Sequence, residues 1–361
     1  MNDETDFEAV LKDRKVLVTG HTGFTGGWAC LWLQSLGATV SGYSLPPETH
    51  PSLFAVAGVE SAIAESTFGD ICEYEQLLNA MRAFEPELVL HLAAQPLVRR
   101  SYREPLRTFQ VNAQGTAHVL EAARTTGVRG VVCVTTDKVY SNNEWPWPYR
   151  ENDPLGGKDP YSASKAAAEM VIQSYAASFP YLDGKGPAIA TARGGNIVGG
   201  GDWSEDRLVP DFVRSVGSGA TLTLRYPDAT RPWQHVLSLV HGYLMLMAKL
   251  AGPNPMAFAR AWNLGPQDPR QYSVREVFEL MGNAWKFPLI EYMNNPLPEA
   301  GALALDSSIA RNLLGWIPPW DTPRVIAQTA NWYQAYTHDP EQAKTITLAQ
   351  IDAYRRALAT A

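Results

Sequence analysis

The segment between residues 15 and 36 constrains the fold of this chain most strongly. An apolar, β-branched run at 15–19 ends at Gly20, and apolar residues recur at helical spacing over 25–36. Between them, Gly20 permits a tight turn, Gly23 lets backbone amides approach a phosphate, and Gly26 lets the helix pack against the strand. This order of strand, turn and helix N-terminus favours a site for the pyrophosphate of a dinucleotide. A purely structural glycine turn is the alternative.

The chain repeats the alternation of strand and helix up to residue 192. Short runs rich in Val, Ile and Leu predict strands, and apolar residues three and four positions apart predict helices. Strands are expected at 38–43, 88–92, 130–135 and 188–192, and helices at 74–84, 106–124 and 162–179. Strands that are apolar throughout are typical of a parallel sheet covered on both faces. The pattern predicts an α/β fold with a Rossmann-type doubly wound parallel sheet.

The residues after 192 are less regular and predict a smaller mixed α/β substrate-binding lobe. Five glycines fall within 194–201, and 237–264 is expected to return to the first lobe. The predicted domains are therefore 1–192 with 234–266 for the cofactor, and 193–233 with 267–361 for the substrate. Beyond residue 200, we expect strands at 221–224 and 261–264, and helices at 210–216, 237–250, 274–285, 307–314 and 323–336.

The composition excludes several classes of protein. With 45% hydrophobic and 19% charged residues, the chain can bury a large core and is not typical of a disordered protein. The 30 basic and 37 acidic residues give a net charge of −7, and no basic run indicates nucleic-acid binding. The longest apolar stretches fall short of the ~18 residues that a membrane span needs.

The cysteines, the histidines and the N-terminus carry little functional signal. Three widely separated cysteines do not indicate a disulfide framework, and the polar N-terminus is not typical of a signal peptide. We therefore expect a cytoplasmic protein. The seven histidines show no metal-binding spacing, so we expect no metal, and His235 is interpreted as a packed residue.

Tyr161 and Lys165 form a YxxxK motif at the start of a predicted helix. The spacing places both side chains on one helical face. The pKa of a free tyrosine is about 10, and a nearby ammonium together with a cationic cofactor would lower it. Tyr161 is therefore a candidate base for a substrate hydroxyl, with Lys165 as its electrostatic helper. Tyr181 and Lys185 repeat the spacing in a Pro/Gly-rich stretch, where we interpret them as structural.

The end of the second predicted strand leaves the choice between NAD and NADP open. An acidic residue that binds the ribose 2′-hydroxyl of NAD is expected about 20 residues after the glycine loop. Ser44 stands at that position instead, and no arginine stands there to bind a 2′-phosphate. This segment alone does not separate the two dinucleotides.

Several segments, in order along nearly the whole chain, resemble the extended short-chain dehydrogenase/reductase family. They are TGxxGxxG (19–26), HLAAQ (91–95), Asn112, TTDKVY (135–140), YSASK (161–165) and RxxN (193–196). The longer segments are similar to the CDP-glucose 4,6-dehydratases within this family. These are GHTGFTGGW (20–28), PSLF (51–54), AAQPLVRRSY (93–102), TDKVY (136–140), GGKDPYSASK (156–165), GGGDWSEDRLVPD (199–211) and RPWQHV (231–236).

The resemblance implies NAD as cofactor, CDP-glucose as substrate and a redox-neutral loss of water. Tyr161 would take the proton of the sugar 4-hydroxyl while hydride passes from C4 to NAD, and Thr136 would hydrogen-bond the 4-oxygen. The C4 ketone acidifies the C5 hydrogen, water leaves across C5 and C6, and the hydride returns to C6. Asp137 resembles the family's acid for the C6 hydroxyl. Lys138 stands where related dTDP-sugar dehydratases have a glutamate at C5.

The division of roles between Asp137 and Lys138 stays open, because the two residues could share or exchange them. From the residues alone, a solvated pair at the end of a strand is also an alternative. By resemblance, NAD would contact Gly20, Thr22, Gly23, Phe24, Thr25, Gly26, Asp70, Ile71, Ala93, Ala94, Gln95, Tyr161 and Lys165. For Asp70, capping of the next helix is the alternative.

The substrate diphosphate would, by resemblance, contact Asn196 and Arg231. Arg207 is a further candidate, because an arginine fork suits a phosphate group, and a surface arginine is its alternative. The resemblance also implies a homodimer, or a tetramer, formed through the helices at 106–124 and 162–179. It further implies deoxysugar biosynthesis for lipopolysaccharide O-antigen, with no nucleic-acid or membrane partner.

Two other functions are weighed against this one. The first is another nucleotide-sugar enzyme of the same family, either an epimerase or a dehydratase for a different nucleotide. Epimerases usually carry a small or apolar residue where Asp137 and Lys138 stand, so this pair favours elimination. The second is a non-catalytic NAD-binding regulator. Such proteins tend to lose the Tyr or the Lys of YxxxK, and Tyr161 and Lys165 are both present here.

Overall fold

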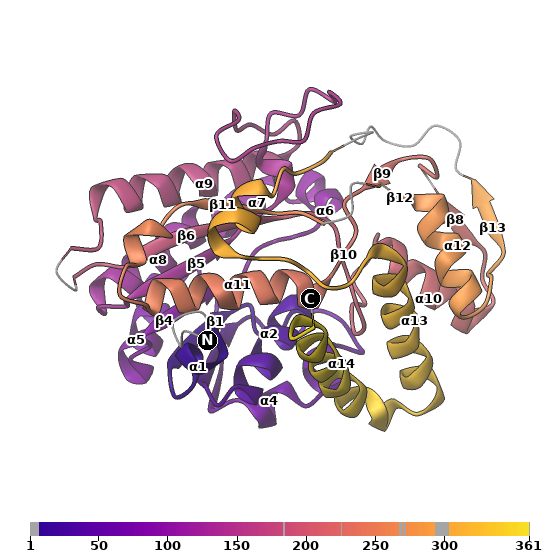
Figure 1. The fold of residues 1–361 in the computed structure, drawn as a ribbon, viewed down its shortest axis with the longest axis horizontal. Helices are drawn as coiled ribbons and strands as arrows, with labels where there is room; N and C mark the ends of the chain where they lie inside the picture. The colour runs from indigo at the N-terminus through magenta and orange to yellow at the C-terminus, as the bar shows by residue number, and fades with distance from the viewer. Residues whose placement is uncertain are drawn as a thin grey trace.

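The centre of the molecule is a parallel sheet of seven strands in the order β11-β6-β5-β4-β1-β2-β3 (Figure 1). The structure is a computed structural model that describes residues 7–182, 185–224, 226–266, 270, 272–292 and 303–360. The order reverses between β1 and β4, which is where open α/β sheets bind ligands. The strands are β1 (Lys15–Thr19), β2 (Thr39–Ser44), β3 (Glu65–Phe68), β4 (Leu88–His91), β5 (Gly130–Val134), β6 (Ala188–Gly194) and β11 (Ala261–Leu264).

Helices cover both faces of this sheet (Figure 1). On one face, α2 (Phe24–Ser35) and α11 (Val236–Ala251) pack against strands from β1 to β6. On the other face, α5 (Tyr74–Phe84), α8 (Gly115–Thr125) and α9 (Pro160–Ser178) form a row over buried strand residues. Both faces of the strands are therefore covered by apolar side chains, which is why the strand sequences are continuous apolar runs. The predicted doubly wound parallel sheet is confirmed.

A smaller lobe lies to the right of the sheet in Figure 1. Its described part contains two helices and three short two-stranded sheets, and α11 and β11 carry the chain back to the large sheet, as predicted. The exact domain boundaries stay a prediction. The elements of this lobe are α10 (Leu208–Ser218), α12 (Val274–Ala284), β7 (Ile197–Val198) with β10 (Gln234–His235), β9 (Thr230–Arg231) with β12 (Tyr272–Ser273), and β8 (Leu222–Leu224) with β13 (Ile290–Tyr292).

Two C-terminal helices follow: α13 (Thr322–His338) packs against α12 and β10, and α14 (Ala343–Leu358) packs against α2 and α13. Tyr333 of α13 donates a hydrogen bond to the carbonyl of Asp202 and accepts one from its amide, at 2.5 and 3.0 Å. This contact anchors the loop that precedes α10. At the far end, Arg355 of α14 forms a bidentate ion pair with Glu8 of α1 (Phe7–Leu11).

The periodicity of the sequence misses several elements, among them β3, α6 (Val98–Arg103) and α14. β3 is an edge strand whose four residues are half-buried or exposed, so no apolar run marks it. α6 is short and carries three arginines. The buried face of α14 includes polar Thr347 and Gln350, so it has no continuous apolar stripe. The remaining short helices are α3 (Leu53–Val56), α4 (Val59–Ala62) and α7 (Pro105–Phe109).

The single helix predicted over 106–124 is wrong in its centre. A π-helical turn, Gln110–Gln114, separates α7 from α8. This wider turn carries the buried Asn112, whose side chain accepts from the amide of Gln95 at 2.8 Å and donates to its carbonyl at 3.1 Å. The same amide group donates to Ser164 of α9 at 2.8 Å. The helix thus departs from α geometry where one side chain joins the loop after β4 to α9. A second π turn, Ala310–Leu314, replaces most of the helix predicted at 307–314.

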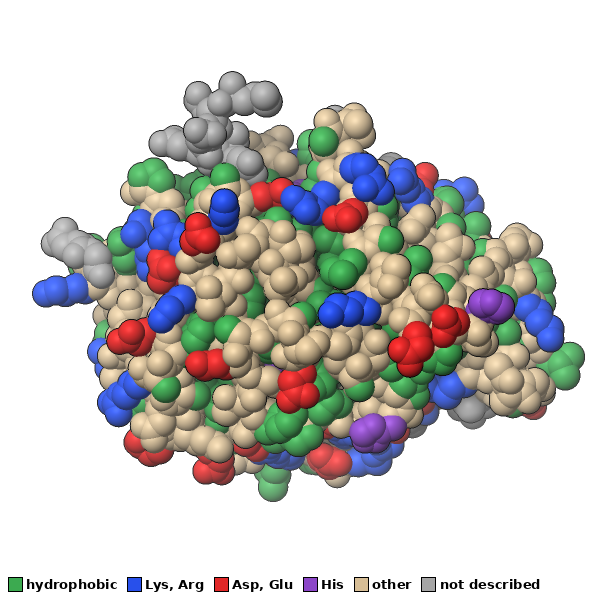
Figure 2. Space-filling view, turned by 90° about the horizontal axis from the view of Figure 1, so that it is seen from below, with side chains coloured by type: hydrophobic (Ala, Val, Ile, Leu, Met, Phe, Trp, Pro, Cys, Tyr) green, Lys and Arg blue, Asp and Glu red, His purple; other side chains and the backbone are tan. Residues whose placement is uncertain are grey.

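The surface carries charges of both signs. Figure 2 shows acidic and basic side chains interspersed over one face of the molecule. This mixture is unlike the continuous basic face of a typical nucleic-acid-binding surface. Among the described residues, no helix combines the length and the apolar character needed to cross a bilayer.

Candidate functional site

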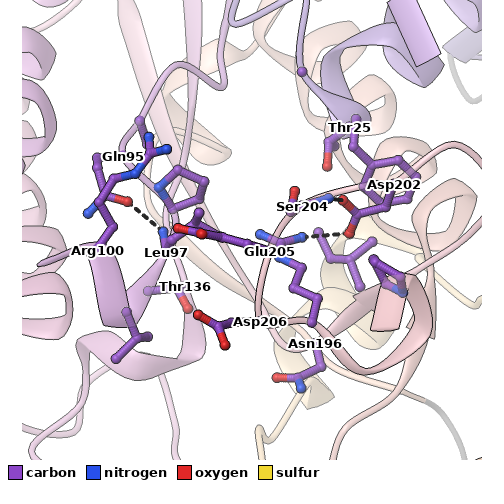
Figure 3. A pocket seen from close by; sticks show the side chains of 18 of the residues that line it. Thr25, Gln95, Leu97, Arg100, Thr136, Asn196, Asp202, Ser204, Glu205 and Asp206 are labelled. Atoms are coloured by element: carbon purple, nitrogen blue, oxygen red, sulfur yellow. Dashed lines mark hydrogen bonds and ion pairs between the residues drawn. The ribbon is translucent and has the colours of Figure 1, made fainter. Parts of the chain in front are cut away.

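A cavity of about 620 Å³ lies at the carboxyl ends of β1, β4, β5 and β6. Figure 3 shows Thr25 from α2, Gln95 from the loop after β4, Thr136 from the loop after β5, and Asn196 from the smaller lobe around the same space. The parallel sheet thus gathers residues that are far apart in the sequence. The walls include all the predicted site residues: Gly20, Thr22, Gly23, Phe24, Thr25, Gly26, Asp70, Ile71, Ala93, Ala94, Gln95, Thr136, Asp137, Lys138, Tyr161, Lys165, Asn196, Arg207 and Arg231.

The glycine loop has the geometry of a phosphate cradle. Gly20 has a φ of +78°, which favours glycine, and a Cβ there would lie 2.8 Å from the backbone nitrogen of Ala93. A Cβ on Gly26 would lie 2.1 Å from the carbonyl oxygen of Gly20. Gly23 caps α2 without a side-chain hydrogen bond, so the helix N-terminus can offer its amides to an anion. These features fit the pyrophosphate of a dinucleotide.

Replacing Gly26 with Ala is expected to abolish measurable dinucleotide binding, because the new methyl group would push α2 away from the turn that it must contact. Isothermal titration with NAD measures the loss, and thermal unfolding shows whether the fold survives. Gly217→Ala is the matched control, since no atom lies within 4 Å of its added Cβ. That change in a helix should raise stability by up to about 1 kcal/mol and leave binding unchanged. Unchanged binding in Gly26→Ala would contradict the cradle.

The loop after β4 is held by a chain of buried hydrogen bonds. The hydroxyl of Thr19 accepts from the amide of Ala93 at 3.3 Å and lies 2.8 Å from Nδ1 of His91. The other ring nitrogen of His91 lies 3.0 Å from the Thr116 hydroxyl, which donates to the carbonyl of Asn112. All these groups are satisfied if the His91 proton is on Nε2. Burial, with Lys165 nearby, lowers the pKa of His91 to about 3, so the ring is neutral.

Gln95 lines the cavity, but its side chain is committed to the fold. Its amide nitrogen donates to the hydroxyl of Thr108 at 2.9 Å, and its oxygen accepts from the backbone of Leu97 at 2.7 Å. A ligand beside this loop would therefore contact the backbone of residues 93–95 more than the amide of Gln95.

The far end of the cavity contains Asp70 and Ile71. Asp70 accepts from the backbone of Cys72 at 2.9 Å and forms an ion pair with Arg107. Burial raises its pKa, but these partners outweigh burial and hold the pKa of Asp70 below its usual range. Asp70 thus orders the turn before α5 rather than capping that helix. Nearby, Thr22 bridges the hydroxyl of Ser44 and the carbonyl of Leu45, at 2.9 and 2.8 Å, and the carbonyl of Ser44 accepts from the amide of Gly69 at 2.8 Å.

Thr136, Asp137 and Lys138 follow β5 on a single 3-10 turn, Asp137–Val139. The hydroxyl of Thr136 accepts from the amide of Lys138 at 3.3 Å and donates to Asp137 at 3.0 Å. The second carboxylate oxygen of Asp137 is buried and has no protein partner. Burial raises the pKa of Asp137, although Lys138, Thr136 and Arg231 act against the shift. A carboxyl group in this position can hold a proton that a surface aspartate would lose.

Tyr161 and Lys165 lie on the first two turns of α9, which Asp159 caps through the amide of Ser162. Both side chains are at least 90% buried. Lys165 donates to the carbonyl of Val134 at 3.1 Å, and burial lowers the pKa of its ammonium to about 8. Burial raises the pKa of Tyr161 to about 12, and a hydrogen bond with Thr136 opposes this shift. The lower Tyr161 pKa expected from the sequence therefore depends on the charge of a bound cofactor.

Asn196, Arg207 and Arg231 follow β6 in the sequence and line the same cavity as the glycine loop. Arg207 donates to the buried carboxylate of Asp202 at 3.1 Å. Asp202 also accepts from the amide of Ser204 at 3.0 Å, as Figure 3 shows. Because Tyr333 anchors the backbone of Asp202, Arg207 is oriented through this carboxylate and is not a free surface arginine.

Sequence reasoning missed a group of ion pairs in the wall of the cavity and next to it. Arg103 of α6 pairs with Glu205 at 2.7 Å, and Arg99 approaches Asp206 to 3.5 Å. Arg100 forms a bidentate pair with Glu48 at 2.8 and 2.9 Å. Arg99 and Arg100 lie in the segment 93–102, and Glu205 and Asp206 lie in the segment 199–211, but the pairing of the charged residues depends on tertiary contacts. The pairs of Arg103 with Glu205 and of Arg99 with Asp206 connect α6 with the loop before α10, whereas the pair of Arg100 with Glu48 connects α6 with the loop after β2.

Two further predictions concern residues outside the chemistry. Tyr181 and Lys185 do not line the cavity, which agrees with a structural role for the second YxxxK pattern. His235 caps α11 by accepting from the amide of Leu237 at 3.2 Å, and its ring packs against Trp28 and Trp320. Within the described residues, no group of three or more His, Cys, Asp or Glu side chains is placed to hold a metal ion.

Comparisons with known proteins agree with this geometry. A family model described as "NAD dependent epimerase/dehydratase family" matches residues 16–265. A CDP-glucose 4,6-dehydratase of Salmonella typhimurium is 42% identical over 330 residues, which cover 90% of this chain and 91% of that protein. A UDP-glucose 4-epimerase of Erwinia amylovora is 28% identical over 339 residues, covering 88% and 97%.

Solved structures share the fold at lower identity. A dTDP-glucose 4,6-dehydratase from Streptomyces venezuelae, with NAD and TYD bound, has a TM-score of 0.75 at 24% identity, covering 91% of this chain and 99% of that one. A UDP-glucose 4-epimerase from Thermus thermophilus in complex with NAD has a TM-score of 0.75 at 25% identity, covering 89% and 99%. The family match over residues 16–265 and the 42% identical relative agree with the motif resemblance, and the chain belongs to the NAD dependent epimerase/dehydratase family.

Proposed function

We propose that this protein is a CDP-glucose 4,6-dehydratase that converts CDP-glucose into CDP-4-keto-6-deoxy-glucose. The observation that carries the proposal is the placement of Asp137 and Lys138 in one cavity with Tyr161 and Lys165. Oxidation and reduction at a sugar carbon need Tyr161 and Lys165. Loss of water needs an additional acid and base, for which Asp137 and Lys138 are the candidates. The 42% identical Salmonella relative supports the choice of CDP-glucose.

The cofactor proposed for this site is NAD. The glycine cradle, the exposed N-terminus of α2, and the backbone of residues 93–95 would hold its pyrophosphate and ribose groups. Asp70 and Ile71 would lie near the adenine, and Lys165 near the nicotinamide ribose. When bound, NAD supplies the acceptor and later the donor of the hydride. The protein residues described next bind, orient and move protons.

Tyr161 is the proposed base for the sugar 4-hydroxyl. Its phenol lies in a buried site, so a proton transfer there is shielded from solvent. Thr136 would hydrogen-bond the 4-oxygen, because its hydroxyl is bonded to Asp137 in the wall of the cavity that Tyr161 also lines. Lys165, whose ammonium already contacts the end of β5 through Val134, would favour the phenolate by its charge.

Asp137 is the proposed acid for the C6 hydroxyl. Burial keeps its carboxyl protonated to a higher pH than usual, and its unpaired oxygen is available to a ligand. Lys138, which is only partly buried, would take the C5 proton. An exchange of these two roles is the remaining alternative. Asn196, Arg207 and Arg231 are proposed to bind the diphosphate, because the two guanidinium groups can form charge-assisted hydrogen bonds with it.

The pH dependence of NAD binding tests the role of Lys165. Burial lowers the pKa of Lys165 to about 8, so its charge is present below this pH and is lost as the pH rises through it. Affinity for NAD should therefore fall between neutral pH and about pH 10, where a free lysine would still be charged. Titrations of Lys165→Met should give weaker binding without this pH dependence. The same alkaline loss in both proteins would refute the assignment.

Substrate choice is tested by incubating the purified protein and NAD separately with CDP-, dTDP-, UDP- and GDP-glucose. The 4-keto-6-deoxy product is expected from CDP-glucose. Product from another nucleotide, with none from CDP-glucose, would move the proposal to a different dehydratase. An epimerised sugar without loss of water would favour the epimerase that the 28% identical relative represents.

The proposed homodimer is supported by exposed apolar side chains on and beside the expected helices. Leu106 and Phe109 of α7 are 86% and 39% exposed, and Met170 of α9 is 58% exposed. Burial of such residues in a partner interface would remove apolar surface from water. A tetramer, the cytoplasmic location and the link to lipopolysaccharide O-antigen stay predictions.

A further inference from the structure

A buried ion pair lies behind the cavity wall, between α9 and the end of β6. The side chains of Glu169 and Arg193 are 0% and 1% exposed. The guanidinium group donates from Nε and Nη2 to the two carboxylate oxygens, each at 2.9 Å. Neither residue lines the cavity, so neither is placed to touch the substrate.

This pair is hydrogen-bonded to both ends of the Thr136–Lys138 segment. The hydroxyl of Thr135, directly before the segment, donates to Glu169 at 2.6 Å. Arg193 donates through Nη1 to the hydroxyl of Tyr140, just after the 3-10 turn, at 2.8 Å. Tyr140 in turn donates to the side chain of Asn263 on β11 at 2.6 Å. One ion pair therefore ties the start and the end of the segment to α9, β6 and β11.

The segment depends on such anchors more than α9 does. A 3-10 turn is short and has poorer hydrogen-bond geometry than an α-helix. Tyr161 and Lys165, by contrast, belong to a 19-residue α-helix whose own backbone bonds fix them. Glu169 lies one helical turn after Lys165, so the ion pair connects the segment to the helix that carries the YxxxK motif.

A buried charged network of this kind fixes geometry rather than adding stability by its presence. Removing charges from water carries a large cost, which the ion pair and its hydrogen bonds offset only when the geometry is good. Here each carboxylate oxygen and each guanidinium nitrogen has at least one partner. A satisfied network is rigid, because any displacement of one member leaves another unpaired in a low-dielectric interior.

We propose that the Glu169–Arg193 pair is a positioning device that sets Thr136, Asp137 and Lys138 against Tyr161 and Lys165. The inference rests on the proposed dehydratase reaction and deepens it. Because the anchored segment carries the acid and base for loss of water, disturbing the anchors slows elimination more than the first oxidation.

Thr135→Val and Tyr140→Phe test the proposal without breaking the ion pair, since each removes one linking hydroxyl. In single turnover, reduced nicotinamide should form at nearly the wild-type rate and then persist, because elimination is slow. Steady-state kcat should fall by about tenfold to a hundredfold, the scale of a small misplacement of reacting groups. KM and the affinity for NAD should stay within about threefold of the wild-type values, because a small misplacement of reacting groups affects the chemical step more than binding. Thr135→Ser keeps the hydroxyl and should recover most of the activity.

Hydrogen exchange provides a readout that needs neither cofactor nor substrate. Amides of residues 135–141 should exchange faster in both variants, while those of α9 should not change. Glu8→Gln, which breaks the bidentate pair with Arg355 far from the cavity, is the matched control and should leave exchange and turnover unchanged.

Wild-type turnover in both hydroxyl variants would overturn the proposal. An equal slowing of oxidation and elimination, with weaker NAD binding and faster exchange in α9, would also overturn it and indicate a general structural role. Failure of the proposed function is seen separately, because the wild-type protein would then dehydrate no nucleotide sugar before any variant is compared.

Discussion

Asp137→Asn and Lys138→Ala are each expected to reduce dehydration by at least about a hundredfold, the scale of general acid–base catalysis. Asparagine retains the shape of Asp137 but has no acidic proton to give to the leaving hydroxyl. Alanine at 138 removes the amine proposed to take the C5 proton. Both residues follow β5, away from the glycine cradle, so titration should show NAD binding close to that of the wild type. Product formation from CDP-glucose is the measurement.

Lys158→Ala is the matched control for these variants. Lys158 is exposed, lies just before α9 and does not line the cavity, so its removal should not change the rate. If Asp137→Asn and Lys138→Ala both turn over like the wild type, the assignment of the acid and base to this segment is wrong. If only one of them is impaired, the roles do not divide as proposed.

Tyr161→Phe should reduce the first oxidation by about a hundredfold to ten-thousandfold, because the variant lacks the base for the 4-hydroxyl proton. The ring that fills the buried site is retained, so the fold and NAD binding should persist. Reduced nicotinamide formed in a single turnover with CDP-glucose measures this step directly, before any water is lost.

The second YxxxK pattern supplies a control in the same protein. Tyr181→Phe makes the same chemical change outside the cavity and should leave the oxidation unchanged. Normal formation of reduced nicotinamide in Tyr161→Phe would contradict its role as the base, whatever the effect on the overall rate.

Much of the fold follows from sequence pattern because buried parallel strands are apolar runs. β1, β4, β5 and β6 are of this kind, and their predicted positions agree with the structure to within two residues. β3 is not predicted, because an edge strand with polar, half-exposed residues lacks that pattern. The π turn at Gln110–Gln114 is not predicted from the sequence pattern, because it depends on the tertiary contacts of Asn112 with Gln95 and Ser164.

The residues of the site can be predicted where they directly follow the end of a strand or lie at the start of a helix. Parallel strands bring their carboxyl ends to one edge of the sheet. The proximity of the glycine loop, the segment after β5 and the start of α9 can therefore be predicted from the order of the elements. The pairings of charged residues, by contrast, cannot be predicted in this way. Arg103 with Glu205, and Arg193 with Glu169, join segments whose separation in space no local pattern encodes. Asp202 and Arg207 lie in one loop, but the orientation of Arg207 also depends on the contact of Asp202 with the distant Tyr333.

The central claim is that one active site oxidises C4, removes water and reduces C6 of the same sugar. CDP-glucose carrying deuterium at C4, incubated with the protein and NAD in ordinary water, tests it most directly. The expected result is a 4-keto-6-deoxy product in which the deuterium has moved to C6. Deuterium retained at C4 of an epimerised sugar, or no conversion of CDP-glucose, would contradict the claim.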